Sequence, residues 1–349
     1  MISTKDFSKR FVGYNIVDCE VRRRNFFYFI AREDYTKWTD WKETGDHPSE
    51  RSLYKKIITF TLSEAPKKQW GHGLLKGFSR LTSSVAFQPK EQLIVGSLSG
   101  QIYVIGSGEH EIQGEIKSDL RGSLNSLRTI EGSVYLAGSG RVSGIRRGKD
   151  DWQWISRDTP YDQKTELYTA GFDVMDGFSS NDIYAAGGDG DVWHYDGKSW
   201  RRIDFPSNLT IGTMCCGADG KVYISGYEGL SFVGRGDDWK PVKRREIIPL
   251  GFKDIVWYED RVWCTNDIGV WWIVNDEIVS ASIPAFAKVS SGNLSARDGV
   301  LLLAGFYGAA YLENGQWNEI FTHSEMVDRC KAEGLYDGVL KARWHEFKD

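Results

Sequence analysis

Short apolar segments alternate with turn residues along most of the chain, and the same pattern returns about every 39 residues. Six of these segments read LIVGSLSG (93–100), VYLAGSG (134–140), IYAAGGDG (183–190), VYISGYEG (222–229), VWCTNDIG (262–269) and LLLAGFYG (301–308). Each is a short strand that ends in glycine or a substitute, and positions 187, 226, 266 and 305 are separated by 39, 40 and 39 residues. Such regularity indicates a repeated supersecondary unit.

Turn residues divide each repeat into four strands. Glycines at positions 190, 229, 269 and 308 predict a two-residue hairpin loop, because positive φ angles there favour Gly, Asn or Asp. A second turn precedes each glycine strand, as at Asp219-Gly220, so another strand comes before it. Tryptophans 200, 239 and 317 follow a third turn and indicate a closing fourth strand. A four-stranded sheet of about 40 residues is the blade of a β-propeller.

We therefore predict an all-β protein, a β-propeller of about seven four-stranded blades over residues 1–321, with a short C-terminal helical extension (322–349) packed on it. The predicted blades are 10–70, 71–117, 122–156, 166–204, 208–243, 248–283 and 289–321. The first blade is divergent, since it carries a polar insertion (32–52) and shows strand patterns only at 26–31 and 54–62. Thr322 and Glu325 have capping-box spacing, which predicts a helix over 323–333 that ends at Gly334.

Two segments resemble known propeller repeats. LTSSVAFQPKEQLIVGSLSGQIYVI (81–105) looks like a WD-type repeat, although the Gly-His and Trp-Asp signatures are absent. IYAAGGDGDVWHYDGKSW (183–200) resembles a kelch or bacterial propeller repeat, with Gly187-Gly188, Tyr195 and Trp200 in order. Neither motif recurs intact, so the resemblance implies the architecture over about residues 10–320 and no single family.

Charge and composition narrow the function. The net charge is −4 and the pI is about 6.0, which argues against a general nucleic-acid binder. The first residues contain no signal-peptide core, and no stretch approaches the roughly 18 apolar residues of a membrane span. We expect a cytoplasmic protein that does not bind membranes and is a monomer on its own.

No catalytic or metal motif stands out. Five cysteines are widely spread without a CxxC pair, and six histidines show no HxH or HExxH spacing. We therefore predict no metal, no cofactor and no catalytic residue, and expect Cys215, Cys216 and Cys264 to be buried thiols. The basic runs at 22–24 and 243–245 are expected to be solvated turn charges.

The WD-like strand order predicts one face that displays the loops between second and third strands. That face would carry 97–99, 139–141, 188–189, 227–228, 267–268 and 306–307, together with the 32–52 insertion. Aromatic side chains there would anchor a partner, and carboxylates would meet its Lys or Arg residues. The candidate partner-binding residues are Trp38, Trp41, Asp189, Tyr227, Glu228, Asp267, Phe306 and Tyr307.

The leading functional prediction is a non-enzymatic module that binds another protein. A compact, acidic, unexported propeller with degenerate blades resembles, in general type, the bacterial immunity proteins that neutralise secreted nuclease toxins, which implies a basic nuclease as partner. One alternative is an enzyme or glycan binder that uses the central channel, but the innermost strands, such as 124–130 and 213–216, are largely apolar or neutral. A scaffold in a multiprotein complex is a further alternative.

Overall fold

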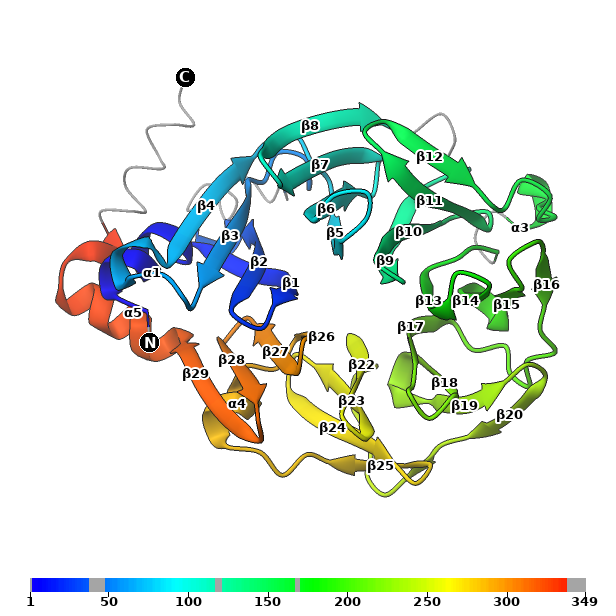
Figure 1. Cartoon of the computed structure of the whole chain (residues 1–349). Helices are drawn as coiled ribbons and strands as arrows, with labels where there is room; N and C mark the ends of the chain where they lie inside the picture. The colour runs from blue at the N-terminus through cyan, green and yellow to red at the C-terminus, as the bar shows by residue number, and fades with distance from the viewer. Residues whose placement is uncertain (1, 38–47, 117–120, 167–169, 338–349) are drawn as a thin grey trace. The chain divides into compact units, whose positions relative to one another are not determined.

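The computed structural model describes residues 2–37, 48–116, 121–166 and 170–337. Its fold is the predicted all-β propeller of seven blades, each built from antiparallel strands that follow one another in the sequence (Figure 1). The described residues form two compact units, unit 1 from residues 1–78, 267–269 and 282–349, and unit 2 from residues 79–266 and 270–281.

Unit 2 contains five blades. Their strands are β5 (Leu81–Ala86), β6 (Gln92–Ser97), β7 (Gln101–Gly106) and β8 (Glu109–Glu115); β9 (Leu124–Ile130), β10 (Ser133–Gly138), β11 (Val142–Gly148) and β12 (Asp151–Trp154); β13 (Val174–Ser179), β14 (Asp182–Ala186), β15 (Val192–Tyr195) and β16 (Trp200–Arg202); β17 (Ile211–Cys216), β18 (Val222–Gly226), β19 (Ser231–Arg235) and β20 (Asp238–Pro241); and β22 (Asp254–Tyr258), β23 (Arg261–Asn266), β24 (Gly269–Val274) and β25 (Glu277–Ser280). A two-residue strand, β21 (Lys243–Arg244), pairs in parallel with β25.

The first strands of successive blades in unit 2 lie side by side, in the order β5, β9, β13, β17 and β22 (Figure 1). Both faces of each blade are buried, because successive side chains of a strand point to opposite faces. In β10, Val134 and Leu136 pack with the blade of β5–β8, whereas Tyr135 and Ala137 pack with the blade of β13–β16. This explains why the middle strands read as continuous apolar runs.

The glycines that define the repeat allow two backbones to approach closely. A Cβ atom on Gly187 would lie 2.2 Å from the carbonyl oxygen of Gly171, and one on Gly226 would lie 2.5 Å from that of Thr210. Neither glycine has a positive φ. Positive φ occurs three residues later, at Gly190 (φ 65°) and Gly229 (φ 66°), where the tips are three-residue 3-10 turns, η4 (Gly188–Gly190) and η5 (Tyr227–Gly229), rather than the predicted two-residue loops.

Unit 1 contains the N-terminal and C-terminal blades. Their strands are β1 (Tyr14–Arg23), β2 (Phe26–Glu33), β3 (Lys55–Thr61) and β4 (Trp70–Leu75), and β26 (Asn293–Arg297), β27 (Val300–Gly305), β28 (Gly308–Glu313) and β29 (Gln316–Thr322). The first blade therefore has four strands and extends to residue 75, whereas the sequence pattern showed two strands and a boundary at residue 70.

The two blades of unit 1 pack directly against each other, with β1 beside β26 and β27 (Figure 1). One buried cluster contains Val21 and Phe29 from the first blade and Leu302 and Phe321 from the last. The backbone N–H of Val21 donates to Ser295 Oγ over 2.9 Å. The divergent first blade thus meets the last blade through side-chain packing, without exchanging a strand.

Helices complete the core of unit 1. Helix α1 (Thr4–Arg10) contributes Phe7, and helix α5 (His323–Ala332) contributes Met326 and Cys330 to the same cluster. Helix α4 (Ala285–Val289) lies against β28 and β29. The helix at 323–332 confirms the prediction, and Gly334 follows it with φ 69°. The capping box does not form, because the Thr322 hydroxyl donates to Glu319 Oε1 instead.

Within the described residues, no helix combines the length and the apolar character that crossing a bilayer requires.

Candidate functional site

In unit 2, the hairpin tips between second and third strands share a face with the connections between blades. The backbone N–H of Gly190 donates to the carbonyl of Leu209 over 2.8 Å, and that of Ile211 to the carbonyl of Gly187 over 3.1 Å. An equivalent bond joins Leu124 to Leu98 over 3.0 Å in an earlier pair of blades. Each tip is thereby held by the start of the next blade, as the WD-like order predicts.

Two predicted partner-binding residues of unit 2 lie on such tips with exposed side chains. Asp189 occupies the turn η4 with φ 52°, a left-handed conformation that Asp tolerates better than most residues. Tyr227 begins the turn η5, and its side chain is 69% exposed. Glu228 lies at the same turn as Tyr227. A large aromatic side chain on a fixed turn is typical of an interface anchor.

Arg141 belongs to a predicted surface tip, but its side chain is buried. Its Nε donates to Asp191 Oδ2 over 2.6 Å and its Nη2 to Asp191 Oδ1 over 3.1 Å. Nη2 also donates to Glu166 Oε1 over 2.7 Å, and Nη1 to the carbonyl of Pro160 over 2.6 Å. Arg141 therefore joins the third and fourth blades from inside and is unavailable to a partner.

Arg141 lowers the pKa of Glu166, and its guanidinium lies over the ring of Trp193. Hydrogen bonding from Arg141, then from the backbone of Asp162, lowers the pKa of Glu166. Trp193 Nε1 donates to Asp191 Oδ1 over 2.9 Å, and the Arg141 guanidinium lies 5.1 Å from the centre of the Trp193 ring. Sequence reasoning missed this network because its members are 25 to 50 positions apart.

In unit 1, the remaining described candidates lie on the tips of the last two blades. Tyr307 is 59% exposed and its ring centre lies 6.4 Å from that of Phe306, which is partly buried. The backbone N–H of His323 donates to the carbonyl of Tyr307 over 2.8 Å and fixes this tip to the start of α5. Asp267 is partly buried beside the exposed Ile268. Trp38 and Trp41 lie outside the described residues.

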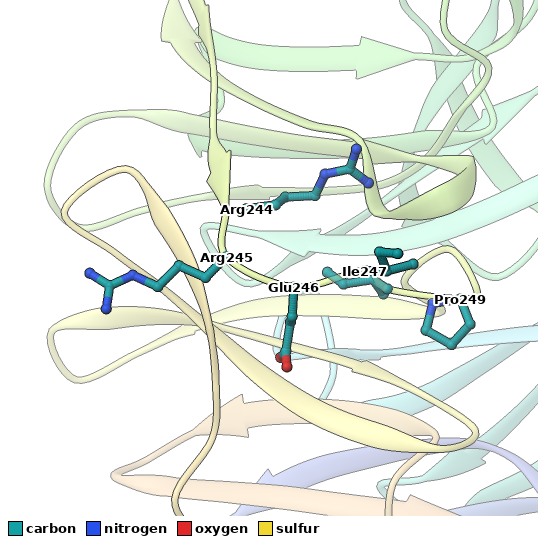
Figure 2. A pocket seen from close by; sticks show the side chains of 6 residues that line it. Arg244, Arg245, Glu246, Ile247 and Pro249 are labelled. Carbon is teal, nitrogen blue, oxygen red and sulfur yellow. The ribbon is translucent and has the colours of Figure 1, made fainter.

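A second exposed apolar segment in unit 2 was missed. The connection between β21 and β22 carries Ile247, which is 91% exposed, and Leu250, which is 50% exposed. These residues line or adjoin a surface hollow of about 550 Å³ bounded by residues 244–249 (Figure 2). A sequence signal is present in KRREIIPLG (243–251), where apolar residues stand outside any predicted strand.

An ion pair joins the first strands of two neighbouring blades, where the sequence pattern predicted largely apolar or neutral residues. Arg128 on β9 and Asp176 on β13 form two parallel hydrogen bonds of 3.0 Å each, and Asp176 raises the pKa of Arg128. The backbone N–H of Cys216 on β17 also donates to Asp176 over 2.8 Å. All three groups serve the packing of neighbouring blades.

The described part of the chain holds no cluster of metal-ligating side chains, and four of its five thiols are buried. No three His, Cys, Asp or Glu side chains come close enough there to hold a metal ion. All five cysteines are free thiols, and burial raises the pKa of Cys215, Cys216 and Cys264. Among the basic runs, Arg24 pairs with Glu313 and Arg245 with Glu277, as solvated surface charges do.

Solved structures of other proteins share this fold, and one protein of known name is similar in sequence. No protein-family model matches the chain. The WD40 β-propeller domain of Doa1 superposes with a TM-score of 0.56 at 12% identity, over 84% of this chain and 90% of that domain. PorZ, a surface component of the type-IX secretion system of Porphyromonas gingivalis, gives 0.55 at 12% identity, over 88% of this chain and 38% of PorZ. These two likenesses show the fold alone.

The similarity at the sequence level is to an immunity protein. The chain is 28% identical over 244 residues to Immune protein Tsi7 of Pseudomonas aeruginosa. The alignment covers 69% of this chain and 79% of Tsi7. The chain is thus a seven-bladed β-propeller with a curated relative that is named for immunity.

Proposed function

We propose that this protein is a cytosolic, non-enzymatic immunity protein that binds a toxin and blocks it. The observation that carries the proposal is the similarity to Tsi7, because it extends over 244 residues, more than half of the chain. Within each unit, the packing of the blades would fix the hairpin tips, which are the proposed binding surfaces.

Exposed tip residues are the proposed contacts. Tyr227 in unit 2 and Tyr307 in unit 1 would each bury an aromatic ring against the toxin, and Asp189 would meet a basic side chain. Phe306, Glu228 and Asp267, which also lie on tips, and Trp38 and Trp41, which lie outside the described residues, remain proposed contacts. Rigid tips favour affinity, since little conformational freedom is lost on binding.

We further propose that the toxin is a basic nuclease. A net charge of −4 would attract a basic protein, and covering a basic active site with an acidic, aromatic surface would exclude nucleic acid. The proposal that the protein is non-enzymatic is supported by the engagement of Arg128 and Asp176 in a packing ion pair.

The test is binding and inhibition by the purified protein. A catalytically inactive variant of the protein encoded by the neighbouring gene should bind this protein, as measured by calorimetry. The active form of that toxin should lose its nuclease activity when the two proteins are mixed at a 1:1 ratio. Absence of binding at low salt would contradict the immunity role. Binding with no effect on any toxin activity would favour the scaffold alternative, and turnover of aryl glycosides or simple esters would favour the enzyme alternative.

A further inference from the structure

A carboxylate without a counter-ion lies at the tip end of the blade β13–β16 in unit 2. Asp173 immediately precedes β13, and its backbone N–H donates to the carbonyl of Ala186, the last residue of β14, over 2.8 Å. Its side chain is partly exposed, and a Cβ atom on Gly187 would lie 3.3 Å from its Oδ2. Asp173 therefore lies beside the tip η4, which carries the proposed contact Asp189.

A chain of hydrogen bonds from the neighbouring blade fixes the orientation of this carboxylate. The hydroxyls of Ser139 and Ser123 lie 2.8 Å apart, and the Ser123 hydroxyl donates to Asn125 Oδ1 over 2.7 Å. Asn125 Nδ2 then donates to Asp173 Oδ1 over 2.7 Å and to the carbonyl of Phe172 over 3.3 Å. Because the Asn125 oxygen accepts from Ser123, its amide hydrogens must face Asp173. The carboxylate is thus held in place before any partner arrives.

Two buried carboxylates of the same blade are paired with arginine, whereas Asp173 is not. Asp176 accepts two hydrogen bonds from Arg128, and Asp191 accepts two from Arg141. Within the described residues, the Asp173 carboxylate forms no ion pair and accepts a single hydrogen bond, at Oδ1. Its Oδ2 remains open to a donor from another protein.

The environment of Asp173 disfavours its charged form. Burial raises the pKa of this carboxyl above its ordinary value of 3.8, and the charge of Arg80, which is exposed, lowers it in part. A partly desolvated carboxylate that lacks a counter-ion reduces the stability of the folded chain. Groups of this kind are concentrated at functional sites, where a ligand supplies what the protein itself withholds.

We propose that Asp173 receives a lysine side chain of the toxin. Asn125 already occupies one carboxylate oxygen, and a single open oxygen suits the compact ammonium of Lys better than the two-pronged guanidinium of Arg. The pair would be strong for a surface contact, because the protein around Asp173 excludes part of the water that would screen it. This inference rests on the proposed immunity function and adds one contact residue together with the chemistry of its partner.

An isosteric substitution tests the role of the charge. Asp173→Asn removes the charge but keeps the oxygen that accepts from Asn125, so it should retain or raise the thermal midpoint. It should weaken binding of the inactive toxin by at least about 30-fold. Asp151→Asn is the matched control, since Asp151 is exposed at the start of β12, at the end of its blade opposite the tips, and its affinity should equal that of the wild type. Equal affinity of Asp173→Asn and wild type would overturn the inference while leaving the immunity role intact, and failure of the wild type to bind would overturn both.

A carbodiimide, which joins a carboxylate to an amine in direct contact, tests the chemistry of the partner. Treatment of the wild-type complex should link the peptide that contains Asp173 to a toxin lysine, which mass spectrometry identifies, and the Asp173→Asn complex should lack this link. Replacing that lysine by methionine should weaken binding to the wild type by about tenfold or more and leave binding to Asp173→Asn unchanged. Absence of a link at Asp173, or an equal effect of the lysine substitution on both proteins, would overturn the proposed pairing.

Discussion

Arg141 shows how much one buried charge matters in this fold. Its side chain is 5% exposed and that of Asp191 is 3% exposed, so the pair is buried. Arg141 also pairs with Glu166, and Arg202 Nε lies 3.6 Å from Asp191 Oδ1. Removing one member of such a pair leaves an unpaired charge in a poorly solvated place, which is more costly than the pair is favourable. Blade packing in unit 2 therefore depends on an interaction that is absent from the repeat pattern.

Arg141→Ala should lower the free energy of unfolding by about 3–5 kcal/mol, because Asp191 loses its main partner. Urea denaturation followed by tryptophan fluorescence measures this. The control is Arg201→Ala, which breaks an exposed pair with Asp237 and should leave the free energy of unfolding nearly unchanged. Similar losses in the two variants would show that the Arg141 pair is not a structural connection.

Glu166 gives the same network a pH dependence. Hydrogen bonding from Arg141 holds the folded-state pKa of Glu166 below its ordinary value of 4.5, so its stabilising effect is present above 4.5 and is lost as the pH falls through the folded value. The stability difference between wild type and Glu166→Gln should therefore be largest near neutral pH and shrink on acidification. A difference that grows in acid would contradict this account.

At the scale of single elements, the repeat glycines permit close packing between a tip and the next connection. Gly187 serves this role with φ −162°, whereas Gly190, the glycine for which the sequence pattern predicted a turn conformation, has φ 65°. Gly187 therefore allows close packing, whereas Gly190 allows a left-handed turn, and this difference is visible in the structure.

Gly187→Ala should destabilise the protein by about 2 kcal/mol or more, because the new Cβ would lie 2.2 Å from the Gly171 carbonyl oxygen. Gly212→Ala is the control, since nothing lies within 4 Å of its Cβ, and it should be neutral or stabilising by about 0.4–1 kcal/mol. Thermal unfolding of the two variants checks the difference. A wild-type midpoint for Gly187→Ala would show that the connection moves freely.

Elements were predicted best where apolar strands and turns recur. Strands β9 and β17 match the expected innermost strands 124–130 and 213–216, because each carries buried apolar residues between turn residues. In the first blade, β1 was missed because YNIVDCEVRR carries charged residues along half of its length, and β4 because WGHGLL contains two glycines. The exposure of Ile247 and the burial of Arg141 depend on contacts with distant segments, which local patterns do not encode.

At the scale of the whole molecule, the net charge of −4 predicts that binding depends on salt. If the partner is a basic toxin, a net charge of −4 would speed association at low ionic strength, and salt would screen that attraction. The association rate should fall roughly tenfold between about 0.05 M and about 0.5 M NaCl, with a smaller change in the dissociation rate. Stopped-flow mixing measures both. A salt-independent association rate would show that charge does not steer the encounter.

The composition of unit 1 has a consequence for how the protein is made. Its core joins Phe7 and Phe29, which precede unit 2 in the sequence, to Phe321, Met326 and Cys330, which follow it. Unit 2 is drawn from the interior of the chain and has all its strands before the last blade is translated. The N-terminal blade therefore lacks its packing partners until residues 321–330 have been translated, so a chain cut short before α5 would expose an apolar surface prone to aggregation.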